Sequence, residues 1–283
     1  MKNLLVFLVM SLPAAVSAQK LSNKLNFQKG AKMEVVLQIH SVISQGMGDT
    51  KVNSTLTRVY DVNDVTSEGI SMEHKVKRLQ MDFEMAMMGS QSFDSENEAD
   101  MKGEAGKAME KTLKNKYSMT IDPTGKVLKV KKDDDNPNTA QEASPDMITS
   151  LLGQMGEGIG IPSVGDRTEF KILPEREIGK GESWTDSTGT TKITYTLTEL
   201  NDTEALIDFV EESSSDRKQE MMGMEVAIST KDKTKGRIIL DRKTGLMKEK
   251  TAVTESAGTM DIMGQQAPLN TRTTKTYTVK PVA

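Results

Sequence analysis

The sequence contains no cysteine, and this absence excludes several kinds of protein at once. None of its 283 residues can form a disulfide, act as a thiol nucleophile or carry the lipid of a bacterial lipoprotein. Stability must therefore come from burial of apolar side chains. Histidine is almost as scarce, since only His40 and His74 are present and neither lies in an HExxH motif. We expect both to be surface or half-buried strand residues rather than metal ligands.

Aromatic residues and a strong charge of either sign are also lacking. Aromatics make up 4% of the chain, and the formal net charge is −4 at pH 7. This balance argues against a nucleic-acid partner and against binding to an anionic membrane surface. Methionine is abundant instead, with 20 residues, and we expect it to take over much of the apolar packing.

Long apolar runs are absent after the first residues. The run from Leu4 to Met10 is short, follows the basic Lys2, and precedes small residues at 16–18. This pattern predicts a secretory signal over residues 1–18, cleaved after Ala18, so that the protein is exported to the periplasm or the extracellular space. No later segment approaches twenty apolar residues, so we expect no transmembrane segment in the mature chain.

Alternation of apolar and polar residues dominates the rest of the chain. It is clear around Val35 and in the runs 56–62, 193–200, 205–210 and 271–279. Threonine and β-branched residues enrich these runs, as is typical of strands with one buried and one solvated face. The sequence therefore predicts a mainly β protein built on an antiparallel sheet.

Two segments follow a helical period instead. Residues 98–114 carry apolar side chains at spacings of three and four, and residues 144–156 begin with Ser144 and Pro145, a common helix start. The polar stretch 133–143 resembles an exposed linker. We expect a curved, half-barrel-like antiparallel sheet with the two helices packed on its concave face.

Three short patterns recur in the same order in the two parts of the chain. Residues 27–30 resemble 178–181, residues 61–64 resemble 199–202, and 119–127 resembles 238–246 with one extra residue. The shared Asn-Asp and Thr-Gly pairs suit hairpin turns. We therefore expect two similar halves, residues 19–132 and 144–283, which form either one domain or two.

No motif for catalysis or for a cofactor is present. The glycine-rich stretch 156–161 lacks the last glycine of GxGxxG and follows a predicted helix, and neither a phosphate-binding GxxxxGK nor a GxSxG occurs. The acidic run 133–135 lacks the remaining ligands of a calcium loop. We expect no cofactor, no metal from these residues and no enzymatic activity.

The candidate functional residues are apolar. Met81, Met85 and Met87 share one strand face with Phe83, which favours core packing or a lipid-facing surface, with Cu(I) binding by methionine sulfur as an alternative. Further candidates for core or apolar-ligand contact come from the second predicted helix, from the single tryptophan and from a predicted strand: Leu151, Leu152, Met155, Trp184 and Phe209.

Four features together resemble an uncharacterised family of exported proteins from Gram-negative bacteria. They are the leader ending in Ala18 and Gln19, Phe93 to Ser95 after a methionine-rich strand, Gly181 to Thr185, and Asp241 to Gly245. The resemblance implies no known activity, and its expected architecture is similar to periplasmic lipoprotein-carrier folds. We expect a non-catalytic protein that binds an apolar or lipid-like molecule or an envelope protein, or else a structural scaffold with a filled core.

Overall fold

The structure is a computed structural model that describes residues 20–45, 48–85, 89–114, 116–132, 160–221, 224–262 and 264–282. The predicted signal, the linker 133–143 and the helix 144–156 lie outside these residues.

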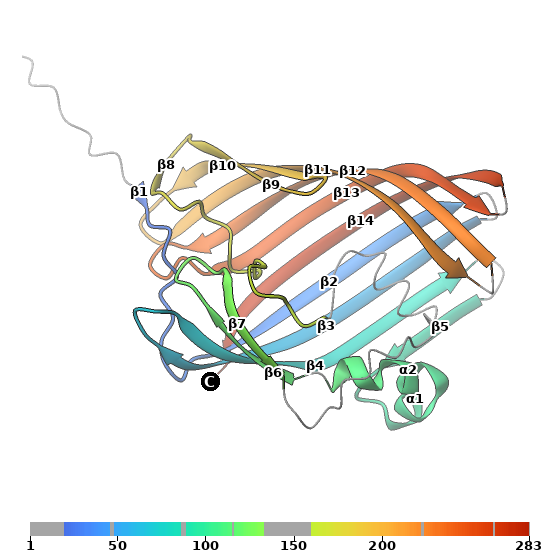
Figure 1. The fold of residues 1–283 in the computed structure, drawn as a ribbon, viewed down its shortest axis with the longest axis horizontal. Helices are drawn as coiled ribbons and strands as arrows, with labels where there is room; N and C mark the ends of the chain where they lie inside the picture. Colours follow the sequence, from blue (N-terminus) through green and yellow to red (C-terminus); the bar gives the residue numbers. More distant parts are fainter. Residues whose placement is uncertain are drawn as a thin grey trace, which may run out of the picture.

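The alternating runs form long antiparallel strands in one 12-stranded sheet, which confirms the mainly β prediction (Figure 1). The sheet order is β7-β6-β4-β3-β2-β14-β13-β12-β11-β10-β9, with β5 also paired to β4, so the sheet is open between β7 and β9. The strands are β2 (Lys32–Gln45), β3 (Gly48–Val65), β4 (Ile70–Met85), β5 (Gly89–Asp94), β6 (Lys116–Ile121), β7 (Val127–Lys132), β9 (Ser183–Thr188), β10 (Thr191–Leu200), β11 (Glu204–Met221), β12 (Met224–Asp241), β13 (Met247–Ile262) and β14 (Gln265–Val282). A separate pair joins β1 (Lys20–Leu21) to β8 (Ile178–Gly179).

The recurring sequence patterns fall at equivalent points of two five-strand runs, β2-β3-β4-β6-β7 and β9-β10-β11-β12-β13. Gly30 and Gly181, with φ of 82° and 85°, end the turns before β2 and β9. The Asn-Asp pairs lie at the ends of β3 and β10, and the Thr-Gly pairs turn β6 into β7 and β12 into β13. The two runs belong to one continuous sheet, because β14 pairs with β2.

The Thr-Gly turns share their hydrogen bonding. Asp122 Oδ1 accepts from the backbone N and the hydroxyl of Thr124, both at 2.7 Å, and Asp241 Oδ1 accepts from the same two atoms of Thr244, both at 2.8 Å. These are aspartate turns of the kind that the sequence pattern predicts.

The strap, residues 160–177, crosses from one edge of the sheet to the other. At β7, the Val127 N–H donates to Asp166 O (2.8 Å), and at β9, Arg167 pairs with Asp186. Gly125 must be glycine at this crossing, because its φ is +97° and a Cβ would lie 2.8 Å from the Lys171 nitrogen. The strap therefore closes one end of the curved sheet, at the left of Figure 1.

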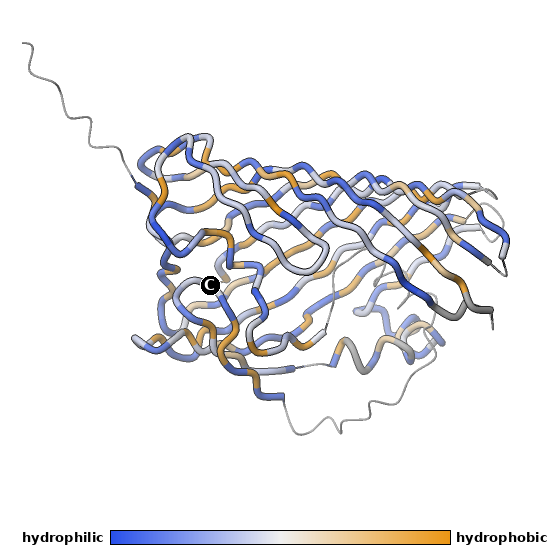
Figure 2. Tube along the Cα trace, turned by 45° about the horizontal axis from the view of Figure 1, so that its top comes forward, coloured by the Kyte–Doolittle hydropathy of each residue, from blue (hydrophilic) through white to orange (hydrophobic). Residues whose placement is uncertain are grey.

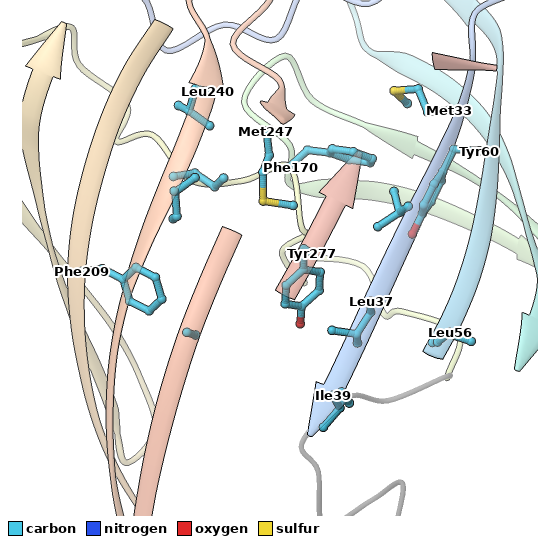
Figure 3. Packing of buried hydrophobic residues seen from close by; sticks show 14 of the residues in the cluster. Met33, Leu37, Ile39, Leu56, Tyr60, Phe170, Phe209, Leu240, Met247 and Tyr277 are labelled. Atoms are coloured by element: carbon cyan, nitrogen blue, oxygen red, sulfur yellow. The ribbon is translucent and has the colours of Figure 1, made fainter. Parts of the chain in front are cut away.

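The main apolar core lies beneath the strap, on the concave side of the sheet, which we call the inner face. Phe170 packs edge-on against Phe27 and Tyr60, with ring centroids 5.5 and 5.3 Å away. Figure 3 shows Phe170 and Tyr60 with Met33, Leu240 and Met247 gathered between the strands. The orange and blue residues that alternate along the strands in Figure 2 reflect the period of two.

The predicted helix 98–114 is present but broken. It consists of α1 (Glu98–Lys102) and α2 (Glu104–Leu113), which are separated at Gly103. Met109 is buried in the core, and Met101, Ala105 and Leu113 pack against it. The helices lie against the inner face near β4 and β5, as predicted for the concave side (Figure 1).

Candidate functional site

The inner face changes its chemistry from one half of the molecule to the other. Strand register places side chains that face each other across the sheet on the same side. On β2, β3 and β4 this gives a mainly apolar surface, which we call the apolar wall and which Ser41 and Ser54 interrupt: Ile39, Ile43, Val52, Met81 and Phe83. On β11–β14 the equivalent surface is a hydroxyl wall: Ser213, Ser215, Thr230, Thr234, Thr254, Ser256, Thr271 and Thr273.

A cavity of about 450 Å³, which we call the trough, lies along the hydroxyl wall. The hydroxyl wall lines it together with charged residues of the same strands and with the apolar Ile43, Phe209 and Leu269. Ser41 at its margin forms a 2.8 Å hydroxyl–hydroxyl hydrogen bond with Thr273. The trough thus offers mostly hydrogen-bonding groups, with apolar contacts at a few points.

Local sequence explains why hydroxyls reach this surface. Serine or threonine stands at two successive inner-face positions of a strand, as in Thr271 and Thr273 on β14 or Ser213 and Ser215 on β11. With a period of two, such residues emerge on one face. Threonine fits a strand as well as valine does, so the hydroxyl row costs little in strand propensity.

Two charged residues face the trough with buried atoms that lack a hydrogen-bond partner in the described part of the chain. They are Arg217 Nε and Asp232 Oδ1. The other Asp232 oxygen accepts a long 3.5 Å hydrogen bond from the Ser213 hydroxyl. A buried donor and a buried acceptor of this kind are costly unless a further group satisfies them.

Lys250 lies where the trough meets a second cavity of about 300 Å³ under the strap. Its ammonium is 5.2 Å from the ring centroids of both Phe209 and Tyr277. Figure 3 shows these two rings on different strands of the inner face. The cation–π geometry holds the lysine between the two cavities.

The second cavity adjoins a buried polar cluster on the first half. Arg58 and Glu169 form an ion pair at 3.2 Å, and the Tyr60 hydroxyl donates to Glu169 at 2.8 Å. Burial alone would raise the pKa of Glu169, but Arg58 and the Tyr60 hydroxyl bring that pKa below its ordinary value. The ion pair therefore anchors the strap residue Glu169 to β3.

His74 belongs to this cluster and is buried, which makes the prediction of a surface or half-buried side chain wrong. Its ring stacks on Tyr117 with centroids 4.5 Å apart and lies 4.9 Å from Tyr60. Neither ring nitrogen has a hydrogen-bond partner within the described ranges. Burial, reinforced by the charge of Arg58, lowers the pKa of His74 to about 4, so the ring is neutral at pH 7.

The candidate residues of the sequence analysis do not form one site. Met81 and Phe83 are buried in the apolar wall, Met85 is half-buried at its end, and Phe209 lines the trough. Trp184 stacks on Tyr195 at 5.2 Å, and its indole N–H donates to Ile172 O at 3.3 Å. The remaining candidates lie outside the described residues: Met87, Leu151, Leu152 and Met155.

Met81 and Met85 do not form one metal site. Met81 and Met85 are four residues apart on β4, which separates them by about 13 Å along the strand. One ion cannot bind both at that spacing. Within the described residues, no group of three or more histidine, aspartate or glutamate side chains could hold a metal ion.

Sequence reasoning missed the hydroxyl wall. The signal was present, because the alternate positions Ser213 and Ser215, and likewise Thr271 and Thr273, carry hydroxyls where an inner strand face is expected to be apolar. Which face those positions share became clear only from the strand register.

Residues 67–247 match a family of unknown function, DUF6263. The chain belongs to this family. The match confirms the expected membership of an uncharacterised family and assigns no activity. No curated protein matches the sequence.

Among solved structures, a lipovitellin structure titled for lipid–protein interactions has a TM-score of 0.51 at 9% identity. It covers 91% of this chain, which spans only 26% of the lipovitellin chain, so the likeness concerns the fold alone. An outer membrane channel from Pseudomonas putida F1 has a TM-score of 0.26 at 10% identity, over 91% of this chain and 98% of the channel. None of the helices in the described ranges is long and apolar enough to cross a membrane.

Proposed function

We propose that the protein is a non-catalytic binding protein whose concave face takes up a lipid-like ligand. The observation that carries this proposal is the trough of about 450 Å³ on the inner face of an open sheet. Ile43 and Leu269 line it beside the apolar wall. A concave site with apolar contacts and a few converging polar groups is the usual form of a small-molecule site.

The fold likeness to lipovitellin supports the same class of ligand. That structure describes lipid–protein interactions, and it covers 91% of this chain. Fold alone does not fix function. The cavity therefore carries the proposal, and the likeness adds the expectation that a sheet of this shape can enclose a lipid.

The composition of the trough supports a role without catalysis. Its serine and threonine hydroxyls have no histidine, the commonest general base, beside them among the residues that line it. Serine and threonine hydroxyls of this kind can serve as binding groups.

A structural scaffold is the second candidate, and the filled apolar wall favours it. Met81 and Phe83 are 1% and 3% exposed, so this half of the inner face is packed core. If the trough also remained empty in the native envelope, the sheet would serve as a scaffold or as a contact surface for an envelope protein.

Lipid extraction and mass spectrometry of protein purified from its native envelope test the proposal. We expect a co-purifying lipid-like molecule in wild type and its loss in Ser256→Trp, because the indole would fill the trough. The matched control is Glu255→Trp, on the outer face of the same strand. Retention of ligand in Ser256→Trp, or its absence from wild type, would favour the scaffold.

We propose further that the protein is exported, because residues 1–18 have the pattern of a cleaved signal. Intact-mass measurement of envelope material should then give a chain that begins at Gln19. An envelope-located chain that retains Met1 would contradict this.

A further inference from the structure

The hydroxyl wall has a chemistry that a purely apolar ligand would not use. An alkyl chain laid along it would take serine and threonine hydroxyls out of water without replacing their hydrogen bonds. That loss is unfavourable for each group left unpaired. A packed apolar surface of the kind found on the first half would bind an alkyl chain better.

We propose that the hydroxyl wall binds a polyol or glycosyl head group, so that the ligand is an amphiphile with its sugar-like head in the trough. This inference rests on the proposed function, because the concave face must first hold an amphiphile. The alkyl part would lie against the apolar side chains of Ile43 and Leu269, at the end of the trough where β2 pairs with β14.

The pairing of donors and acceptors favours hydroxyl groups as partners. Each serine or threonine hydroxyl both donates and accepts a hydrogen bond, and so does each hydroxyl of a sugar. The two unsatisfied buried atoms also need partners of both kinds. Arg217 Nε is a donor that needs an acceptor, and Asp232 Oδ1 is an acceptor that needs a donor. A ligand that only accepts would satisfy one of them and not the other.

The charges of the trough do not select an anionic head group. Glu211 and Asp232 line it together with Arg217, Lys250 and Lys275, so opposite charges nearly balance. A phosphate accepts from Arg217 but offers no donor to the unsatisfied Asp232 Oδ1, whereas a polyol hydroxyl serves either atom. The unsatisfied pair therefore favours a glycosyl head over a phosphoryl head.

Binding measurements with ligands of equal alkyl length separate these possibilities. The probes are monomeric octyl glucoside, octyl phosphate and octanol, with free glucose and a short oligosaccharide as the soluble source of the same chemistry. We expect octyl glucoside to bind about tenfold more tightly than octanol, as two or three net hydrogen bonds would give. Octyl phosphate should bind more weakly than octyl glucoside.

Threonine-to-valine changes test the wall itself, because they replace a hydroxyl by a methyl group at nearly constant volume. Thr254→Val combined with Thr271→Val should weaken octyl glucoside binding about tenfold and leave octanol binding unchanged. The control pair Thr251→Val and Thr276→Val changes neighbouring threonines of the same two strands on the outer face. Equal denaturation midpoints for both double variants would show that the fold is retained.

The outcomes distinguish the glycosyl head group from the proposed binding of a lipid-like ligand. Equal affinity for octanol and octyl glucoside, or a preference for octyl phosphate, would overturn the glycosyl head group while the binding function stands. Binding of the oligosaccharide as tightly as octyl glucoside would keep the polyol site and overturn the lipid-like ligand. Failure of every probe to bind wild type would overturn both.

Discussion

Strands β4 and β11 hold the same place in the two halves, as the third strand of each run, yet their inner faces differ. On β4 the inner face stays apolar through Leu79, Met81 and Phe83. On β11 it begins with the apolar Ile207 and Phe209 and then becomes polar: Glu211, Ser213, Ser215 and Arg217.

The two halves share the turns of the scaffold and differ in the residues of the candidate site. The turn motifs that set strand order are shared by the halves, down to the aspartate that caps each Thr-Gly turn. The inner-face residues are not shared. Polar groups on the first half, such as Arg58 and Tyr60, are paired with the strap residue Glu169. Polar groups on the second half line a cavity.

The largest expected effect is on the apolar wall. Phe83→Ala should lower the free energy of unfolding by about 3–5 kcal/mol, because it removes a large buried ring and leaves a cavity. Ser213→Ala in the hydroxyl wall should change the free energy of unfolding by less than about 1 kcal/mol. Urea denaturation measures both. A loss below about 0.5 kcal/mol for Phe83→Ala would show that the apolar wall is not core and would break the comparison.

The second effect concerns the buried histidine of the first half. The unfolded chain binds a proton on His74 near its ordinary pKa of 6.5, whereas the folded chain does so only near 4. The contribution of the neutral His74 ring to stability should therefore be fully present above pH 6.5. As the pH falls from 6.5 towards 4, the free energy of unfolding should decrease by about 3 kcal/mol in total. His74→Phe keeps an aromatic ring in the stack and should remove this part of the pH dependence.

His40→Phe is the control, because His40 is exposed on the outer face. It should leave the pH dependence of stability as in wild type. Denaturation curves at several pH values between 4 and 7 measure all three proteins. An unchanged slope in His74→Phe would mean that the ring is protonated in the folded state.

The third effect sharpens the contrast between structural and ligand-facing polar groups. Tyr60→Phe deletes the hydroxyl that donates to Glu169 and should cost about 1.5–3 kcal/mol, the range for a hydrogen bond to a charged group. The measurement is again the free energy of unfolding. No loss would indicate that the strap does not depend on this contact.

The smallest expected effect is on the hydroxyl wall. Thr234→Val combined with Thr254→Val removes both members of a hydroxyl pair at 2.8 Å, so neither is left unsatisfied. Stability should change by less than about 1 kcal/mol. A larger loss, seen in the same denaturation assay, would mean that the hydroxyls serve the fold rather than a ligand.

Much of the scaffold could be predicted from sequence because period-two alternation and turn residues are local signals. The runs around Val35 and at 205–210 became strands, and the helical period of 98–114 became α1 and α2. The break at Gly103 was not predicted, although glycine there weakens a helix. The similar turns at Asp122 and Asp241 likewise follow from residue types alone.

The site could not be predicted in the same way, because it depends on which distant strands pair. Ser41 and Thr273 are 232 residues apart, and nothing local shows that their hydroxyls meet. The burial of His74 depends on Glu169 and the strap, which arrive from a later part of the chain. The apolar side chain of Phe83 is compatible with either core packing or a ligand-facing surface. The strand register places it in the core.

Photo-crosslinking with an alkyl glucoside tests the central claim most directly. One version of the probe carries a diazirine on the sugar, and another carries it at the end of the alkyl chain, and peptide mass spectrometry locates each adduct. The account predicts that the sugar probe labels the hydroxyl wall on β11–β14 and that Ser256→Trp abolishes this labelling while Glu255→Trp does not. Sugar-probe labelling on the apolar wall or on the outer face, unaffected by Ser256→Trp, would contradict it.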